Sequence, residues 1–487
     1  MRILLALLLA TPLFAQTYDL VLANGRVMDP ETNLDAVRNV GILNGKIARI
    51  SADPLPAKRT IDASNLVVAP GFIDLHQHSQ DLETQRLKAF DGVTTALELE
   101  MGAPDVAAFL RDKQGHSILH YGTAASHPAA RALVFGAPLP PEVIQPHPGL
   151  PDLVPKSGPA TDQPATPAQL EAIEQRLRSE LDAGALAIGM GIQYTPGATR
   201  LEVIDVFRLA ASRHLPVYTH MRSAGRLEPG SSIEAVSEVI GAAAISGAPL
   251  HIVHINSTCA RDSIECISLV EGARARGLNV TTEAYPYVAG MTAINSALFN
   301  PGWREKFGID YNDLVLPDTG EHLTKARFDE LHNSPEPRSV LVYSNTQEMV
   351  DKVIPNPLIM IASDGATGHP RNAGTYSRVL AQYVREKGSI TLMDALRKMT
   401  LMPAEVLELS TPAGHRKGRL QEGADADIVV FDPATITDRA TYQHPIEPST
   451  GVHYLLVAGT VVIDGAKLVP DTYPGQALLG PGKASSH

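Results

Sequence analysis

Between residues 167 and 285, helical patterns alternate with short apolar segments, and this alternation limits the possible folds more than any other feature. The expected helices are each followed by an apolar run: 167–183 by "ALAIGM", 201–213 by "PVYTH", 231–246 by "PLHIVH" and 260–276 by "LNVTTEAYP". Strands joined through helices lie parallel in one sheet. Closure into a (β/α)8 TIM-like barrel suits the length of 487 residues. An open doubly wound sheet is the alternative, but it would carry a glycine-rich phosphate turn after its first strand, which is missing here.

Both ends of the chain have a different character, typical of β-hairpins. The N-terminal part contains two Asn-Gly pairs between apolar runs, Asn24-Gly25 and Asn44-Gly45, and the far end contains "ADIVVFDP" and "YLLVAGTVVIDGAKLV". We therefore expect residues 16–66 and 410–475 to form one small β-sandwich beside a barrel of residues 67–409. The proline-rich stretch 130–164 is expected to form long loops over one barrel face, and about 300–350 to be an insertion without an assigned role.

The first fifteen residues resemble a secretory signal. Arg2 precedes an apolar run from Ile3 to Leu9, and a small residue, Ala15, offers a cleavage point. A buried N-terminal strand is the alternative, but residues 17–27 already supply one. We expect removal of residues 1–15 and a periplasmic or secreted protein without a membrane anchor, because no later segment is long and uncharged enough to span a bilayer. The net charge of -12, without a basic run, argues against nucleic acid as a partner.

The two cysteines, Cys259 and Cys266, fall seven residues apart in an expected helix. Two helical turns separate their Cα atoms by roughly 10 Å, which is too far for a disulfide bond. No second Cys or His pair stands at the spacing of a zinc finger. We therefore expect neither a disulfide bond nor a structural zinc site from this pair.

The segment "APGFIDLHQH" is an apolar strand that ends in His76 and His78. Residues two apart on a strand share a face, so both imidazoles would point into the mouth of the barrel. Barrel enzymes place their chemistry at the carboxyl ends of the strands, and neutral imidazole is a good zinc ligand. Two histidines in a solvated loop are the alternative, which the flanking strand disfavours.

Further carboxylates and imidazoles close other apolar runs. A single histidine at a strand end is more often structural, but several that converge on one rim indicate metal binding. These residues are Glu98 and Glu100 in "GVTTALELEMG", His220 in "PVYTH", His254 in "PLHIVH" and Asp364 in "PLIMIASDG".

In this order, the motifs "GFIDLHQH", "GVTT", "YTHMR", "IVHIN" and "SDG" resemble the amidohydrolase superfamily. The resemblance covers nearly the whole mature chain, because the terminal strands, including "GADADIVVFDPATITDRATY", are similar to that superfamily's composite sandwich. Smaller segments, "GIQYTPG", "YPYVAG" and "HPRNAGTYSRVL", favour the D-aminoacylase group, the N-acyl-D-amino-acid deacylases. The resemblance implies that Tyr194, Tyr287 and Arg371 lie in segments that bind the substrate's α-carboxylate. A guanidinium group suits that role, although Arg371 could instead form a surface ion pair.

Two departures from this family bear on the site. The family's metal-binding cysteine after "GVTT" is missing, and a glutamate must replace it. We choose Glu100, which lies nearer the rim than Glu98 and could bridge two ions, and Glu98 is the alternative ligand. Where the family often has a carboxylate-binding lysine, this chain has Asn256, which we expect to contact the substrate in its place but which leaves the exact substrate open. The strand ends also lack a lysine that could be carboxylated, which argues against the hydantoinase and dihydroorotase branches.

The sequence therefore predicts a hydrolase with one or two divalent ions, Zn2+ first, bound by His76, His78, Glu100, His220, His254 and Asp364. The metal would activate water, and Asp364 would carry the proton to the departing amine, although it could be a plain ligand. The expected substrate is an N-acyl-D-amino acid or a similar amide with a free carboxylate. A dipeptidase or cyclic-amide hydrolase is the alternative, and a non-catalytic periplasmic binding protein is the more remote one. A serine hydrolase would need a Gly-x-Ser-x-Gly elbow, which the sequence lacks. The oligomeric state stays open.

Overall fold

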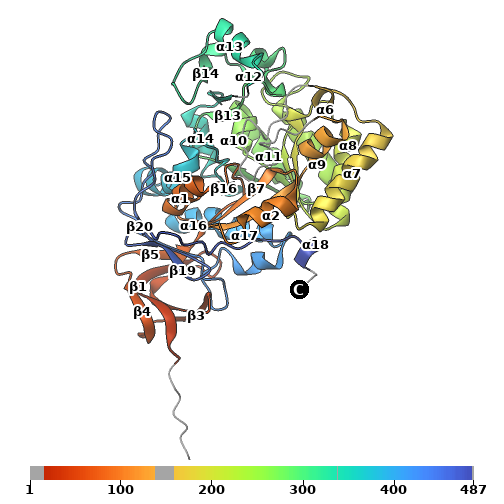
Figure 1. Ribbon diagram of the computed structural model, residues 1–487. Coiled ribbons are helices and arrows are strands. Elements are labelled where there is room, and N and C mark those ends of the chain that lie inside the picture. Colours follow the sequence, from red (N-terminus) through yellow and green to blue (C-terminus); the bar gives the residue numbers. More distant parts are fainter. Residues whose placement is uncertain (1–15, 138–157, 337, 485–487) are drawn as a thin grey trace, which may run out of the picture.

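Eight parallel strands form the centre of the computed structural model, which describes residues 16–137, 158–336 and 338–484 (Figure 1). Their order around the sheet is their order in the chain. The strands are β6 (Phe72–Asp74), β7 (Val93–Ala103), β8 (His120–Ser126), β9 (Ile188–Gly191), β10 (Val217–His220), β11 (Leu250–Ile252), β12 (Val280–Ala284) and β16 (Ile359–Ile361). The first and last strands also meet, because Ser363 N donates to Asp74 Oδ1 (3.0 Å) and His78 N donates to Gly365 O (2.9 Å). The prediction of a (β/α)8 barrel is confirmed.

Helices cover the outside of this sheet. The expected helix boundaries agree with the structure to within three residues, and local capping explains two of them. Thr166 and Gln169 form a capping box at the start of α7, and Gly247 ends α9 with a φ of 79°. The helices are α1 (Leu82–Phe90), α2 (Val106–Lys113), α3 (His127–Val134), α7 (Pro167–Asp182), α8 (Arg200–Ser212), α9 (Ser232–Ser246), α11 (Ser263–Ala275), α14 (Gln347–Val353), α15 (Arg371–Arg378), η5 (Val379–Glu386), α16 (Leu392–Met399) and α17 (Leu401–Leu407).

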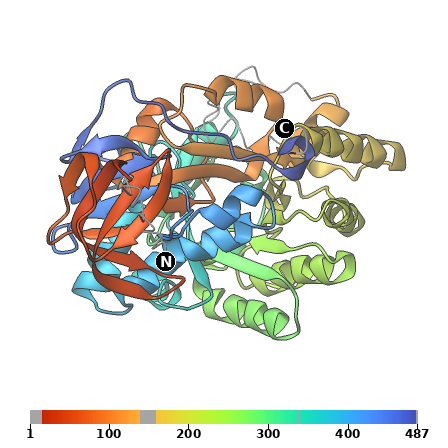
Figure 2. The ribbon, with the colours of Figure 1, turned by 90° about the horizontal axis from the view of Figure 1, so that it is seen from below.

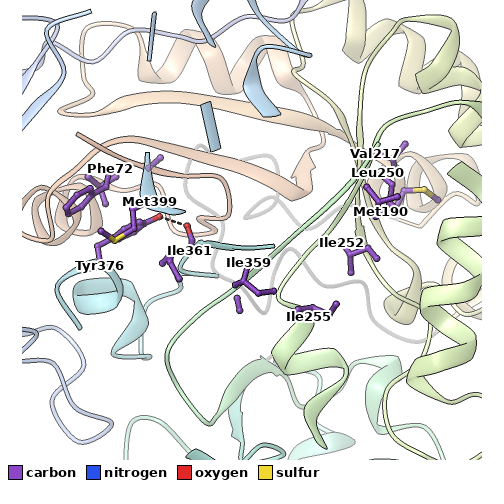
Figure 3. Packing of buried hydrophobic residues seen from close by; sticks show 14 of the residues in the cluster. Phe72, Met190, Val217, Leu250, Ile252, Ile255, Ile359, Ile361, Tyr376 and Met399 are labelled. Atoms are coloured by element: carbon purple, nitrogen blue, oxygen red, sulfur yellow. Dashed lines mark hydrogen bonds between the residues drawn. The ribbon is translucent and has the colours of Figure 1, made fainter. Parts of the chain in front are cut away.

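The largest apolar core lies between the strands and these helices. Figure 3 shows Met190, Val217 and Leu250 of three neighbouring strands gathered on one side, and Phe72 beside Tyr376 of α15 on the other. The rings of Phe72 and Tyr376 stack with 5.4 Å between their centroids. Full burial of such side chains contributes about 1.5–3 kcal/mol each. This packing holds the carboxyl ends of the strands in fixed positions.

Strands from both ends of the chain build a second, nine-stranded sheet, seen in red and blue in Figure 2. Its members are β1 (Tyr18–Asp29), β2 (Leu34–Leu43), β3 (Lys46–Ser51), β4 (Ala57–Asp62), β5 (Val67–Pro70), β17 (Ile428–Phe431), β18 (Val452–Val457), β19 (Thr460–Asp464) and β20 (Lys467–Leu468). β5 pairs with β1 on one side and with β17 on the other. The sheet also folds back on itself, because Ile47 in β3 exchanges backbone hydrogen bonds with residues 423 and 424. The termini therefore form a composite domain, which extends past the expected boundary at residue 66 because β5 (67–70) belongs to it.

One of the two Asn-Gly pairs does not form the expected turn. Asn44-Gly45 connects β2 to β3, with φ of 52° and 74°. Asn24-Gly25, in contrast, lies inside β1, where the pairing with β2 shifts register between Leu22 and Gly25. Asn24 has a φ of 60°, and a Cβ on Gly25 would collide with Val68 of β5. The pair forms a bulge because Val68 of the neighbouring strand β5 packs against Gly25. The cause is therefore a contact between residues that are far apart in the sequence.

The insertion forms a small unit with its own three-stranded sheet, at the end of the barrel opposite the terminal sheet (Figure 1). It contains β13 (Gly290–Ala293), η3 (Ala297–Phe299), α12 (Trp303–Phe307), η4 (Tyr311–Asp313), β14 (Leu314–Val315), α13 (Lys325–His332) and β15 (Ser339–Val342). A separate apolar cluster around Phe299, Trp303 and Phe328 holds it together. No helix of the described residues is long and apolar enough to cross a membrane.

Two expectations fall wholly or partly outside the described residues. These are the signal peptide, at residues 1–15, and most of the proline-rich loops, at residues 138–157. At the edges of the second region, α3 and the short α6 (Pro159–Asp162) are helical.

The expectation that the cysteines are unpaired is wrong. Cys259 and Cys266 form a disulfide bond, with 6.6 Å between their Cα atoms. The estimate from helix geometry failed because the helix is not continuous. Cys259 ends the short α10 (Ile255–Thr258), and the turn η2 (Ala260–Asp262), with a φ of 43° at Ala260, precedes α11. This break brings Cys259 back over the first turns of α11.

Candidate metal centre

The imidazoles and carboxylates predicted to bind metal meet at the carboxyl ends of the barrel strands. His76 and His78 follow β6, and Glu100 lies near the end of β7. The other three residues end or follow later strands: His220 in β10, His254 after β11 and Asp364 after β16. All six side chains are buried. Segments almost 290 residues apart in the sequence thus converge on one small volume.

Glu100 lies at the centre of this group, and its two oxygens face different histidines. Oε2 is 3.1 Å from His76 Nε2 and 3.2 Å from His78 Nε2. Oε1 is 2.7 Å from His220 Nδ1 and 3.0 Å from His254 Nε2. One carboxylate therefore joins two pairs of imidazoles, which is the arrangement of a ligand that bridges two ions.

An irregular part of β7 allows Glu100 to reach this position. The pairing of β7 with β8 shifts register between Glu98 and Ala103. Past this point β7 approaches β9, where a Cβ on Gly189 would lie 2.9 Å from Leu99 O and from the carbonyl carbon of Glu100. Real Cβ atoms essentially never come closer than 3.0 Å to another atom. The close approach of β7 and β9 therefore requires glycine at residue 189.

Two residues of the group have a backbone conformation that L-residues rarely adopt. His254 has a φ of 29° and Asp364 a φ of 49°. They lie two and three residues past the ends of the buried strands β11 and β16, and the left-handed conformation turns the chain sharply there. Such strained residues persist only where the surrounding structure enforces them, and they gather at functional sites.

A second layer of buried groups orients the histidines. Glu283 Oε1 is 2.6 Å from His76 Nδ1, and Glu98 Oε2 is 2.6 Å from His78 Nδ1. Each carboxylate accepts a hydrogen bond from an Nδ1–H group, which leaves Nε2 of each ring to face the centre. Likewise, Gln193 Oε1 lies 2.8 Å from His220 Nε2, so that His220 presents Nδ1 to the centre. The arrangement is that of neutral imidazoles prepared to bind a cation.

The electrostatics of the centre also require a cation. His76 Nε2 and His78 Nε2 are only 3.2 Å apart, so both nitrogens can approach one cation. Burial alone would lower the pKa of His76, but the carboxylates of Asp364, Glu100 and Glu283 raise it to about 10. The surplus of negative charge therefore favours a cation, which is a second proton on the ring when no metal ion is bound and which a bound metal ion would replace. Ligand atoms of His76, Glu100 and His254 lie within 4.8 Å of one another, as do those of His76, His78 and Asp364. The donor set of nitrogen and oxygen atoms fits a divalent metal ion such as zinc.

Arg371 lies directly behind Asp364. Its guanidinium group is 2.8 Å from Asp364 Oδ2, which leaves Oδ1 to face His78 Nε2 at 3.1 Å. The side chain is fully buried and stacks over the ring of Tyr285 at 4.6 Å. Its three guanidinium nitrogens form no hydrogen bond within the described residues. Burial would raise the pKa of Asp364, but Arg371 and His76 together hold it well below its ordinary value, so that it is ionised.

A pocket opens onto this centre. Among the residues expected to contact substrate, Tyr194 lines the pocket, and its hydroxyl group lies 3.1 Å from Thr292 Oγ1. Asn256 does not line it and donates instead to Tyr285 O (2.9 Å). Tyr287 is also outside the lining, between His369 and Tyr442. Arg371 reaches the pocket only through Asp364.

The sequence reasoning missed three buried polar residues around the centre: Glu283, His251 and Gln193. Glu283 connects His76 to His251, whose Nε2 is 3.1 Å from Glu283 Oε2. A signal was available, because Glu283 interrupts the apolar strand pattern of "LNVTTEAYP", and a glutamate at such a position needs a buried partner. Gln193 gave no comparable signal, since its role depends on where the short helix η1 (Ile192–Tyr194) places it.

Comparison with known proteins gives one consistent result. The sequence profile of the amidohydrolase family matches residues 343–463. The N-acyl-D-glutamate deacylase of Alcaligenes xylosoxydans xylosoxydans is 30% identical over 94% of this chain and 96% of its own. The D-aminoacylase of the same organism is 31% identical over 92% of this chain and 95% of its own. A similar solved structure is N-acyl-D-glutamate deacylase from Bordetella bronchiseptica, complexed with zinc and a phosphonate that mimics the tetrahedral intermediate. It superposes with a TM-score of 0.79 and 26% identity, over 96% of this chain and 100% of its own. The protein therefore belongs to the amidohydrolase family, in the group that includes D-aminoacylase and N-acyl-D-glutamate deacylase.

Proposed function

We propose that this protein hydrolyses N-acyl-D-amino acids with the help of one or two divalent metal ions, of which Zn2+ is the first candidate. The observation that carries the proposal is the position of Glu100, whose two oxygens each face a pair of histidine nitrogens at 2.7–3.2 Å. The substrates named for the two relatives and the zinc in the Bordetella bronchiseptica enzyme support it. The proposed metal-binding residues are His76, His78, Glu100, His220, His254 and Asp364.

Asp364 would move the proton. A divalent ion bound at this centre supplies an activated water molecule and polarises the scissile carbonyl group. Asp364 Oδ1 faces the centre while Oδ2 is held by Arg371, so one oxygen is free to act and the carboxylate cannot rotate away. Oδ1 accepts a proton from the attacking water and returns it to the amide nitrogen as the C–N bond breaks. The products are a free carboxylate and a free amine.

Tyr194 and Arg371 are the proposed contacts for the substrate's α-carboxylate. Tyr194 lines the pocket beside His220, with 4.7 Å between the ring centroids. Arg371 is buried behind Asp364 and does not line the pocket, but its guanidinium nitrogens form no hydrogen bond within the described residues, and Asp364 is its ion-pair partner there. An anionic substrate group near Asp364 would meet a cation already desolvated for it. Asn256 and Tyr287 would support neighbouring segments of the wall.

The test combines one variant with a substrate panel. Asp364→Asn should retain metal in elemental analysis but lose turnover by several orders of magnitude, and full activity in this variant would refute the proton-transfer role. The panel contains matched N-acetyl-D- and N-acetyl-L-amino acids, a dipeptide and a hydantoin. Preferential cleavage of the dipeptide or the hydantoin would favour the alternative hydrolases. Stoichiometric metal without cleavage of any amide would favour a binding protein.

We also propose that the protein is exported. The basic start and apolar run at residues 1–15 support this, as does the Cys259–Cys266 disulfide bond, because such bonds persist mainly in oxidising compartments. The mass of the mature protein recovered from the periplasm should correspond to cleavage near Ala15. A protein that keeps its initial methionine and stays in the cytoplasm would contradict export.

A further inference from the structure

The wall of the pocket that lies away from the candidate metal ligands is apolar. Met291, Leu298, Phe307 and Val342 of the insertion line it, together with Ala224 from the loop between β10 and α9. The polar lining residues beside them, including Ser257, Thr292 and Ser344, carry no charge. This apolar wall is where a substrate group that projects away from the scissile amide would lie.

Charged groups are distributed very unevenly around the same pocket. Among the described residues, the lining includes the carboxylates Glu100 and Asp364 but no lysine or arginine. Arg371 is the one arginine or lysine in the described chain that forms an ion pair with a lining residue, and that partner is Asp364. Lys306 neighbours Phe307 in the sequence but is exposed and does not line the pocket. Arg371, behind Asp364, is therefore the one arginine or lysine near the described lining that could serve a substrate carboxylate, and none is available for a second.

The apolar wall is held rigidly by its surroundings. Leu298 and Phe307 pack against the core of the insertion. The loop between β10 and α9 touches α12 so closely that a Cβ on Gly225 would overlap the carbonyl oxygen of Lys306. Gly225 has a φ of 96°, which favours glycine at this contact. The wall is therefore preformed, and its apolar character would select among substrates.

From this uneven distribution we infer the substrate class: N-acyl-D-amino acids with a neutral, apolar side chain, and not those with an acidic one. This inference rests on the proposed function. An acidic side chain against the apolar wall would bury a carboxylate with no lysine or arginine in the described lining to pair with it, which is unfavourable. The two 30–31% identical relatives carry the names N-acyl-D-glutamate deacylase and D-aminoacylase, so relatedness alone does not decide between the two substrate classes.

The test measures kcat/KM of the metal-loaded enzyme for N-acetyl-D-methionine, N-acetyl-D-glutamine and N-acetyl-D-glutamate. Glutamine and glutamate have nearly the same shape, so their ratio isolates the effect of charge. We expect methionine to exceed glutamate by about 100-fold or more, with glutamine between them. Equal or better hydrolysis of the glutamate compound would overturn the inference and leave the proposed function intact. Failure to hydrolyse any of the three would overturn both.

A gain-of-function pair provides an independent check. Leu298→Arg places a cation at the apolar wall, and Leu298→Gln is the neutral control of similar length. The arginine variant should improve kcat/KM for N-acetyl-D-glutamate by about 10-fold over the control and lose activity on N-acetyl-D-methionine. Ser344→Arg with Ser344→Gln repeats the comparison from a half-buried polar position in case the first pair folds poorly. If neither arginine variant favours the glutamate compound over its control, the wall does not contact the side chain and the inference fails.

Discussion

Replacing Gly189 by alanine should damage the metal centre without altering any side chain in it. The added Cβ would lie 2.9 Å from Leu99 O and from the carbonyl carbon of Glu100, and closer still to Glu100 O. Ordinary contact begins at 3.4 Å, so relief of the 2.9 Å contacts alone needs about 0.5 Å, and the shorter contact to Glu100 O needs more. The required separation of β7 and β9 thus exceeds the ~0.5 Å within which a functional site must be held. The distances from Glu100 to both histidine pairs would change at once.

The expected magnitudes follow from this displacement. Overpacking between two strands should lower the free energy of unfolding by about 1–3 kcal/mol. Metal affinity should fall about 10- to 100-fold, as it does when a group that orients a ligand is lost. The assays are chelator competition for metal affinity, guanidinium titration for stability, and kcat/KM on the favoured substrate.

The matched control is Gly241→Ala. Gly241 lies inside α9, and a Cβ there would meet nothing within 4 Å. This substitution should stabilise the protein by up to about 1 kcal/mol through helix propensity and leave metal affinity unchanged. If Gly189→Ala instead binds metal as tightly as the unmodified protein, the close approach of β7 to β9 does not position Glu100, and the reasoning is refuted.

Three further predictions concern the surroundings of the centre. Gln193→Ala should weaken metal binding about 10- to 100-fold in chelator competition, because His220 loses the acceptor that orients it, whereas Gln193→Glu keeps an acceptor and should bind more tightly than the alanine variant. Removing the metal should abolish activity and lower the melting temperature, and re-added metal at 1,000 times its Kd should restore about 4 kcal/mol of stability; a melting temperature insensitive to metal would contradict this. Burial alone would raise the pKa of Asp427, but His120 and Lys417 lower it. Ionised Asp427 therefore stabilises the folded protein fully at a pH above the pKa that this aspartate has in the unfolded chain, and the stabilisation is lost as the pH falls toward its lower pKa in the folded protein. Asp427→Asn should lower the free energy of unfolding by about 3–5 kcal/mol at pH 7. Below pH 5 the midpoint of guanidinium unfolding should depend less on pH in this variant, and an unchanged pH dependence would show that Asp427 does not contribute.

The sequence allowed prediction of the barrel and of the residues that meet at its rim, because both depend on local patterns. His76 and His78 stand two apart at the end of an apolar strand, and in a parallel barrel all such strand ends lie on one face. The six candidate ligands could therefore be grouped before their distances were known. The helix boundaries were predictable for the same reason, since caps such as Thr166 act within one turn.

The features that escaped prediction depend on contacts between distant residues. Asn24-Gly25 forms a bulge because Val68 approaches it, and the pairing of Cys259 with Cys266 depends on a break before α11. The ion pair of Arg371 with Asp364 requires that α15 begin directly behind β16. Nothing in the neighbouring sequence encodes these approaches. They follow from the packing of the whole barrel.

The position of β5 between β1 and β17 sets an order of events in the life of the chain. The ribosome makes β5 some 350 residues before its partner β17, and throughout that time one edge of β5 has no native neighbour. An N-terminal hairpin unit with an open edge cannot close into a stable domain, and it is exposed to wrong pairing with other chains. The terminal domain therefore completes its fold only after almost the entire polypeptide has been synthesised.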